Sequence, residues 1–148
     1  MKRLHVHLAV ADLEQSIRFY CALFAAEPSL RQTDYAKWQL DDPRVNFAIS
    51  TRGRKPGLDH LGIQAEDDAE LEELGTRLAQ ADVAVLPQKN AACCYAKSDK
   101  YWTLDPQGIA WESFHTLDSI PVFGADTASQ ARGETAACCG APGAREAA

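Results

Sequence analysis

The sequence lacks the long apolar segments and clustered basic residues that mark membrane and nucleic-acid-binding proteins. None of its 148 residues belongs to a stretch approaching the roughly 20 apolar residues that span a bilayer. Lys2 and Arg3 are not followed by the continuous apolar core of a signal peptide, because His5, His7 and Asp12 interrupt it. Lysine and arginine number 15 against 21 aspartates and glutamates, so the net charge is −6. We therefore expect a cytoplasmic protein with no nucleic-acid or membrane partner.

The number and spacing of the cysteines are unlike those of a secreted disulfide framework. The five cysteines are odd in number and include two adjacent pairs. Adjacent residues such as Cys93 and Cys94 have Cα atoms about 3.8 Å apart, whereas a relaxed disulfide needs more than roughly 4.4 Å. Two neighbouring thiols are better suited to binding one soft ion. Burial as small hydrophobic side chains stays open for this pair, and it is the role we expect for Cys21.

One pattern of strands and a helix occurs twice along the chain. Residues 3–10 alternate apolar and polar side chains, and Asp12 then caps a helix expected over residues 13–25. The spacing from His5 to Asp12 recurs, 55 residues later, from His60 to Asp67. Further strands are expected over residues 35–40 and 45–50 in the first copy, and over residues 83–86, 88–97, 101–104 and 109–114 in the second. Such repetition predicts the architecture more reliably than local propensity does.

The repeat predicts an α+β fold with two helix-bearing β modules in tandem. We expect one domain over residues 1–118, with module one at 1–52, a linker at 53–57 and module two at 58–116. Side by side, the modules would form a curved, cup-like mixed sheet with the helices outside. Residues 119–148 are rich in alanine and glycine and include Cys138 and Cys139. We expect this tail to be flexible, because it has little apolar surface to bury.

The matched positions of two histidines predict a metal site inside the cup. If the modules are related by a pseudo-twofold axis, His5 of the first strand faces His60 of its repeat. Glu112, in the last strand of module two, supplies a carboxylate, whereas its counterpart in module one is Ala48. Two imidazoles and one carboxylate leave coordination positions open, as in non-haem Fe(II) centres that activate dioxygen. Fe(II) is the expected cofactor, with another divalent metal as the alternative.

Three other polar residues lie near these positions in the expected strands. His7 shares the strand face of His5 and is its main rival as a ligand, although its repeat counterpart is Gly62. Tyr95 and Lys100 could orient a substrate near the thiols. The simpler interpretation of these two is a half-buried ring and a solvated ammonium group.

Three motifs together resemble the vicinal oxygen chelate superfamily of glyoxalases, extradiol dioxygenases and antibiotic-resistance proteins. The resemblance covers about residues 3–116. Its motifs are His5-x-x-Leu-x-Val-x-Asp12-Leu-x-x-Ser-Ile-x-Phe-Tyr20, Asp59-His-Leu-Gly-Ile63 and Asp105-Pro-x-Gly-x-x-Trp-Glu112. The more selective segment Asn90-Ala-Ala-Cys-Cys-Tyr-Ala96 resembles the organoarsenical-lyase and cadmium-induced-protein branch. This resemblance implies paired βαβββ modules, a metal held by His5, His60 and Glu112, and a substrate bound by Cys93 and Cys94.

The resemblance implies an Fe(II)-dependent, dioxygenase-type carbon–arsenic lyase. Its partners would be a trivalent organoarsenical, such as methylarsenite, and dioxygen, and the chain would be a monomer or a homodimer. The leading alternative is a protein that sequesters cadmium or arsenic without turnover, using Cys93 and Cys94 and also Cys138 and Cys139. A glyoxalase-type isomerase is less favoured, because Ala48 occupies the position where module one would supply a second carboxylate.

Overall fold

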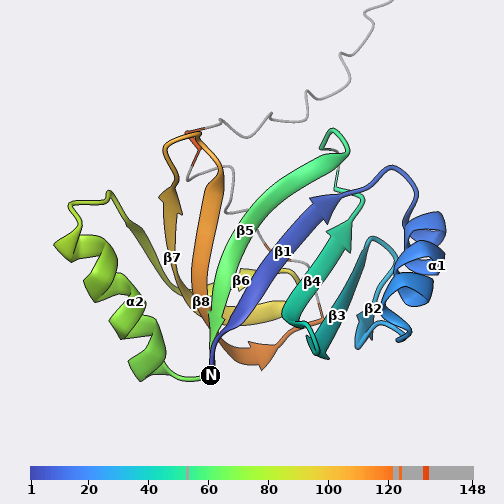
Figure 1. Cartoon of the computed structure of the whole chain (residues 1–148), viewed down its shortest axis with the longest axis horizontal. Coiled ribbons are helices and arrows are strands. Elements are labelled where there is room, and N and C mark those ends of the chain that lie inside the picture. The colour runs from blue at the N-terminus through green and yellow to red at the C-terminus, as the bar shows by residue number, and fades with distance from the viewer. Residues whose placement is uncertain (53, 122–123, 125–131, 134–148) are drawn as a thin grey trace, which may run out of the picture.

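The computed structural model describes residues 1–52, 54–121, 124, 132 and 133 (Figure 1). Its two helices are α1 (Leu13–Phe24) and α2 (Asp68–Gln80). Its eight strands are β1 (Arg3–Ala9), β2 (Leu30–Arg31), β3 (Tyr35–Asp41), β4 (Arg44–Ser50), β5 (Gly57–Ala65), β6 (Leu86–Cys93), β7 (Ala96–Leu104) and β8 (Ala110–Ser119). All eight strands belong to one sheet in the order β2-β3-β4-β1-β5-β8-β7-β6.

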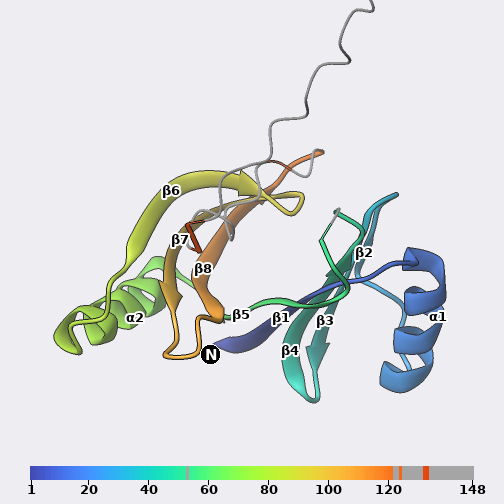
Figure 2. The ribbon, with the colours of Figure 1, turned by 90° about the horizontal axis from the view of Figure 1, so that it is seen from above.

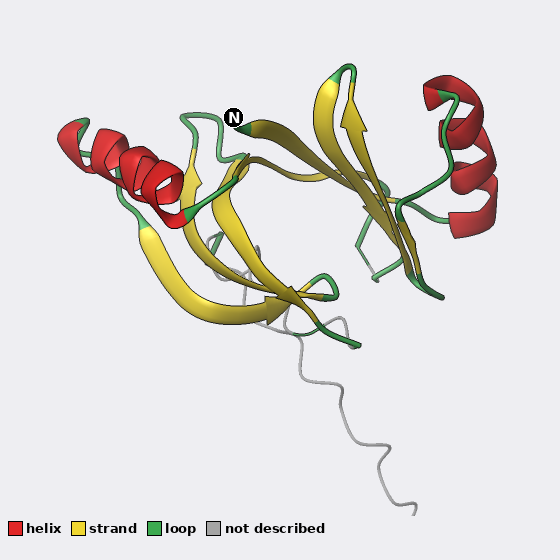
Figure 3. Ribbon diagram, turned by 90° about the horizontal axis from the view of Figure 1, so that it is seen from below, coloured by secondary structure: helices red, strands yellow, loops and turns green. Residues whose placement is uncertain are grey.

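The sheet repeats its topology on either side of its central strands, β1 and β5. These two strands pair antiparallel with each other, β1 pairs parallel with β4, and β5 pairs parallel with β8. The remaining pairs are antiparallel, so the sheet is mixed. Viewed from above, the sheet bends between its two halves, and α1 and α2 lie at opposite outer ends (Figure 2). The view from below shows both helices outside the strands (Figure 3).

Module one packs its helix on a continuous apolar layer. Helix α1 begins at the Asp12 cap, whose carboxylate accepts from the backbone N–H of Gln15 at 2.8 Å. Its inner face meets alternate residues of β3 and β4; the buried members of this cluster are Leu13, Ile17, Ala36, Trp38, Val45, Phe47 and Ile49. The intervening residues of β4 are also buried, on the opposite face of the sheet. Strand β4 is therefore covered on both faces, which fixes its register.

Module two buries less apolar surface beneath its helix. Helix α2 is capped by Asp67, which accepts from the N–H of Glu70 at 2.8 Å, and Leu71 is its fully buried residue. Trp102 and Ala110 form a small buried apolar cluster in this half, and Ala65 and Phe114 are also buried. Polar residues occupy much of the remaining interior of module two, and these residues build the site described below.

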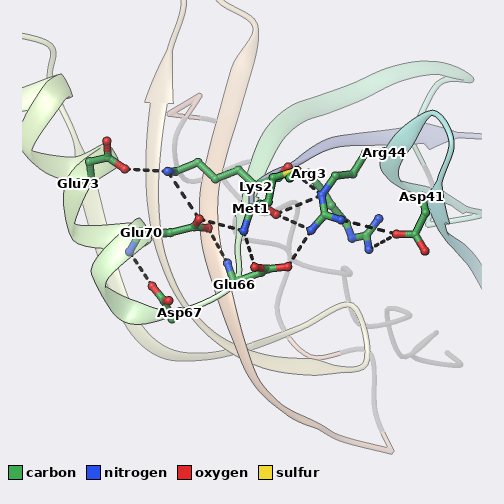
Figure 4. A network of polar contacts seen from close by, with 9 residues as sticks. All are labelled: Met1, Lys2, Arg3, Asp41, Arg44, Glu66, Asp67, Glu70 and Glu73. Atoms are coloured by element: carbon green, nitrogen blue, oxygen red, sulfur yellow. Dashed lines mark hydrogen bonds and ion pairs between the residues drawn. The ribbon is translucent and has the colours of Figure 1, made fainter.

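Ion pairs join the two modules near the N-terminal end of β1 (Figure 4). Arg44 of β4 contacts Glu66, which follows β5, at 2.7 Å. Lys2, just before β1, contacts Glu73 of α2 at 2.7 Å. These groups are partly exposed, so each pair adds little stability by itself. Their position still links the start of module one to the helix of module two.

The structure confirms the predicted α+β class and the curved mixed sheet of two βαβββ modules. Two expected strands were wrong. Residues 83–85 lie outside any strand, because β6 begins at Leu86. Residues 88–97 belong to two strands, which are joined by a tight turn at Cys94 and Tyr95, whose φ angles are 57° and 60°. Most of the predicted tail, including Cys138 and Cys139, lies outside the described residues. Over the part of the chain that is described, neither helix has the length and apolar character needed to cross a membrane.

Candidate metal centre

The ring nitrogens of His5 and His60 meet across the central strands. In the antiparallel ladder the direct partner of His60 is His7, whereas His5 pairs with Gly62. The side chain of His5 nevertheless reaches diagonally to His60, and their Nε2 atoms are 3.1 Å apart. Both rings are buried on the concave side of the sheet. The sequence therefore predicted the meeting of these side chains, although the two residues are not direct cross-strand partners.

Each histidine is oriented by a hydrogen bond at its other nitrogen. Nδ1 of His5 lies 3.0 Å from the backbone oxygen of Asn46, and Nδ1 of His60 lies 3.0 Å from Oδ1 of Asp59. An Nδ1–H that donates to oxygen leaves the Nε2 lone pair available to a cation. Both Nε2 atoms thus point to one place, and the oxygen partners at Nδ1 favour the tautomer that metal binding requires.

Asp59 reaches His60 because of a β-bulge. The pairing of β1 with β5 shifts between His7 and Leu8, so Asp59 has no partner in the ladder while His60 pairs with His7. An unpaired bulge residue can turn its side chain away from strict alternation. The Asp59 carboxylate also contacts Nε of Arg54 at 3.1 Å. The arginine thereby holds the carboxylate that in turn orients His60.

Glu112 completes the cluster from β8. Its Oε2 lies 3.5 Å from Nε2 of His60 and 3.8 Å from Nε2 of His5, and its Oε1 lies 2.5 Å from Nζ of Lys100. Lys100 is only 4% exposed, so the predicted solvated ammonium was wrong. The alternation of β7 turns Lys100 inward, where it neutralises a buried carboxylate.

The charges of the metal-free cluster are mutually dependent. Burial, reinforced by the charge of His60, lowers the pKa of His5 to about 4. Burial alone would lower the pKa of His60 as well, but hydrogen bonds with Asp59 and Glu112 raise it to about 9. Burial would raise the pKa of Glu112, yet Lys100 and His60 hold it well below its usual range. Without a cation, one protonated imidazole therefore lies between two carboxylates, where a metal ion could replace its charge.

The vicinal thiols lie at the tip of the β6–β7 hairpin. Their Sγ atoms are 3.0 Å apart and both cysteines are free. Cys93 packs against Tyr35 and Ala48 of module one, so the hairpin tip of module two reaches across the cup. The Tyr95 hydroxyl donates to Asp34 at 2.5 Å, and Asp34 pairs with Arg52 at 3.0 Å. These contacts fix the turn to the opposite wall.

The two thiols differ in acidity. A hydrogen bond from Cys94, together with the charge of Lys100, lowers the pKa of Cys93 despite its burial. The same hydrogen bond raises the pKa of Cys94, and burial raises it further. The pair therefore loses its first proton from Cys93, and the Cys94 S–H stabilises the resulting thiolate.

Two small cavities connect the thiols with the histidine cluster. One, of about 30 Å³, is lined by residues that include His5, Lys100 and Glu112; the other, of about 100 Å³, is lined by residues that include His7 and His60. Cys93, Cys94 and Glu112 line both cavities. A small molecule bound to the sulfurs would thus lie beside the histidines.

The donor set fits a divalent cation. Two ligand atoms bound at right angles, each about 2.1 Å from a cation, are about 3.0 Å apart. The separations among His5, His60 and Glu112, from 3.1 to 3.8 Å, need only small movements to reach such an arrangement. Glu112 fits a cation less well than the histidines do, because one of its oxygens already accepts a hydrogen bond from Lys100.

Sequence reasoning did not identify the groups that support these donors. Asp59 directly precedes His60, and an acidic residue next to a candidate ligand was a usable signal. Nothing in the sequence marks the bulge that brings Asp59 inward. The backbone oxygen of Asn46 carries no residue-specific signal at all.

Fold and site together define a paired βαβββ protein with a candidate two-histidine, one-carboxylate centre facing a thiol pair. The chain belongs to the Glyoxalase/Bleomycin resistance protein/Dioxygenase superfamily, whose family model matches residues 2–113. Among its relatives is a "Trivalent organoarsenical cleaving enzyme" of Bacillus sp. (strain MD1). That protein is 42% identical over 123 residues, which cover 81% of this chain and 76% of the relative.

Another relative is the "Cadmium-induced protein CadI" of Mycobacterium bovis, which is 32% identical over 94% of this chain and 93% of its own length. Among solved structures, homoprotocatechuate 2,3-dioxygenase from Arthrobacter globiformis matches with a TM-score of 0.58 and 14% identity. The match covers 78% of this chain and 36% of the dioxygenase. At this identity the likeness concerns the fold.

Proposed function

We propose that the protein is an Fe(II)-dependent carbon–arsenic lyase that converts trivalent organoarsenicals, such as methylarsenite, to arsenite. The observation that carries the proposal is the placement of the Cys93–Cys94 pair and Glu112 around the same two cavities. The name of the Bacillus relative, which is a trivalent organoarsenical cleaving enzyme, supports the substrate class. Dioxygen is the second substrate.

The thiol pair binds the arsenical in this proposal. Two sulfur–arsenic bonds form, and the two thiol protons leave with two arsenic hydroxyls as two waters. The Cys93 thiolate makes the first bond, because its pKa is the lower of the pair. Both sulfurs come from one rigid turn, so little freedom is lost when the second bond forms. The bound arsenical then points its organic group towards the histidine cluster.

His5, His60 and Glu112 hold the cation in this proposal, and Lys100 balances the carboxylate charge. Fe(II), when bound by these residues, would supply open coordination positions for the activation of dioxygen. One methylarsenite and one dioxygen balance to one arsenite and one formaldehyde, so no external reductant is required. Tyr35 and Trp102 line the cavities and keep water from the arsenic–carbon bond.

The test is turnover by protein loaded with Fe(II) under anaerobic conditions. After methylarsenite and then oxygen are added, we expect arsenite and formaldehyde in equal amounts, well beyond one equivalent of protein. Glu112→Ala is expected to lower the rate by more than about 100-fold, since it removes a metal ligand. It should retain stoichiometric arsenic binding. Cys21→Ser is the matched thiol control and should keep full activity, whereas Cys93→Ser should lose both binding and turnover.

Sequestration of soft ions is the second candidate function. The 3.0 Å separation of the two sulfurs suits one shared ion, and a relative is named as cadmium-induced. A sequestering protein would stop at one equivalent of product or ligand, and Glu112→Ala would not affect it. Stoichiometric binding without arsenite formation in the loaded protein would replace the lyase proposal with this one. The glyoxalase-type isomerase gains no support, because Ala48 occupies the site of a second carboxylate and is completely buried.

A further inference from the structure

His7 is a buried histidine at the centre of the site to which the proposed lyase assigns no role. It is 3% exposed, its Nε2 lies 2.9 Å from the hydroxyl of Ser50, and its Nδ1 has no hydrogen-bond partner among the described residues. Its ring lies edge-on to that of His60, with 4.9 Å between the centroids. A buried imidazole nitrogen without a partner costs free energy unless something binds it.

One ring nitrogen from each of three histidines lies within 4.8 Å of the others. These histidines are His5, His7 and His60, all buried. Three imidazoles resemble the protein ligand set of three-histidine zinc sites, in which a fourth position is left open. The cluster therefore contains two overlapping donor sets. Both include His5 and His60; one adds Glu112 and the other adds His7.

The strand registers explain why His7 has no equivalent in module two. His7 lies beside Ala48 in the pairing of β1 with β4, and Gly62 lies beside Glu112 in the pairing of β5 with β8. A Cβ atom on Gly62 would be 2.3 Å from the backbone oxygen of Glu112, so a histidine cannot be placed there. Beside the small side chain of Ala48 there is room for one. Each module thus contributes one additional donor, from different strands and from opposite sides of the histidine pair.

We propose that His5, His7 and His60 form a second metal site, which binds Zn(II) while Glu112 stays paired with Lys100. Imidazole is a good ligand for zinc, and zinc imposes no geometry of its own beyond a preference for four ligands. Glu112 stays in place because its carboxylate balances the charge of the buried Lys100. His7 has no such tie at Nδ1.

The two donor sets exclude each other because they share His5 and His60. Zinc generally binds nitrogen sites more tightly than Fe(II) does. Zinc bound through His7 therefore removes both imidazoles from the set that includes Glu112. The inference concerns metal choice, and it can be tested without the proposed reaction.

The first experiment needs no variant. The chain has four histidines, and the fourth, His115, contacts Asp68 on the outside of the protein. Protein labelled with ¹⁵N-histidine is titrated with one equivalent of Zn(II), and the ring nitrogens are followed by NMR. We expect three imidazoles to shift and one to stay unchanged. A shift of only two would show that zinc does not use His7, and any number other than three overturns the proposal.

The second experiment separates His7 from Glu112. Zinc affinity is measured by competition with a chromogenic chelator for the unsubstituted protein, His7→Ala, His7→Asn, Glu112→Gln and His115→Ala. We expect both His7 variants to weaken zinc binding by more than about tenfold, as losing a ligand does. Glu112→Gln, which keeps a partner for Lys100, and the control His115→Ala should change it less than threefold. Circular dichroism establishes that each variant is folded.

The opposite pattern, with zinc binding lost in Glu112→Gln and retained in both His7 variants, would overturn the inference. Loss in all three would overturn it too, because one common site would then explain the data. Arsenite formation serves as a separate measurement. If Fe(II)-loaded protein forms no arsenite, while the zinc titration still shifts three histidines, the proposed reaction is refuted and the zinc site stays in place.

Discussion

The two modules share a backbone plan but place different side chains at equivalent positions around the histidine pair. By strand register, the positions in module one are occupied by His7, Tyr35 and Ala48, and those in module two by Gly62, Lys100 and Glu112. Only module two thus brings a full ion pair into the interior. The repeat supplies a symmetric frame, and the chemistry is concentrated in one copy.

The packing of the modules also differs, and module two is again the more polar of the two. Module one buries a continuous apolar cluster beneath α1, whereas α2 buries chiefly Leu71. Buried polar groups contribute less to stability than apolar ones of similar size. Module one is therefore the stable support. Module two carries the thiol hairpin and the charged groups. The pairing of β1 with β5 attaches it to module one, with further polar contacts at Asp34 and Arg44.

The largest expected effect comes from breaking the ion pair that distinguishes the modules. Lys100→Met leaves Glu112 buried without its counter-charge, so we expect the free energy of unfolding to fall by about 3–5 kcal/mol. Tyr35→Phe, at the equivalent position in module one, removes one hydroxyl and should cost about 0.5–1.5 kcal/mol. Urea denaturation of the metal-free proteins measures both values.

A double substitution checks the reason for that difference. Lys100→Met combined with Glu112→Leu removes both charges, so much of the lost stability should return. If Lys100→Met costs no more than Tyr35→Phe, or if the double variant is as unstable as the sum of the two single ones, the ion pair does not distinguish the modules in the way described.

A smaller loss of stability is expected at Gly62, where module two has no space for a side chain. Gly62→Ala would place Cβ 2.3 Å from the backbone oxygen of Glu112, so the two strands must separate. We expect a loss of about 1–3 kcal/mol. Gly75→Ala is the control within module two, since the atom nearest to its Cβ would belong to the side-chain ring of Tyr101, at 2.9 Å, and not to the backbone, and α2 gains from alanine. Equal thermal unfolding of the two variants would contradict the close approach at Gly62.

The sequence was sufficient to predict the modules and the meeting of His5, His60 and Glu112. The reason is that each lies at a repeat position on a strand with clear alternation, and alternation determines which face a residue occupies. The same reasoning identified Ala48 as the counterpart of Glu112, and the strand registers agree with it.

Features that depend on irregular backbone could not be predicted in this way. The bulge at Asp59 and the turn at Cys94 and Tyr95 both interrupt alternation, and neither carries glycine or proline as a signal. The role of Lys100 could not be predicted without knowing that Glu112 of the neighbouring strand contacts it. Pairing partners far apart in sequence decide such contacts, and the residues themselves do not reveal them.

The smallest expected effect is a difference in acidity between one thiol of each module. Burial raises the pKa of Cys21 in module one, whereas the S–H of Cys94 lowers that of Cys93 in module two. Only the thiolate reacts with iodoacetamide, so the alkylation rate of Cys93 should reach half its maximum at a lower pH than that of Cys21. Mass spectrometry of peptides from metal-free protein follows each cysteine separately. Cys94→Ala should raise the midpoint for Cys93 and leave Cys21 unchanged; an unmoved midpoint would mean that the neighbouring sulfur does not activate the pair.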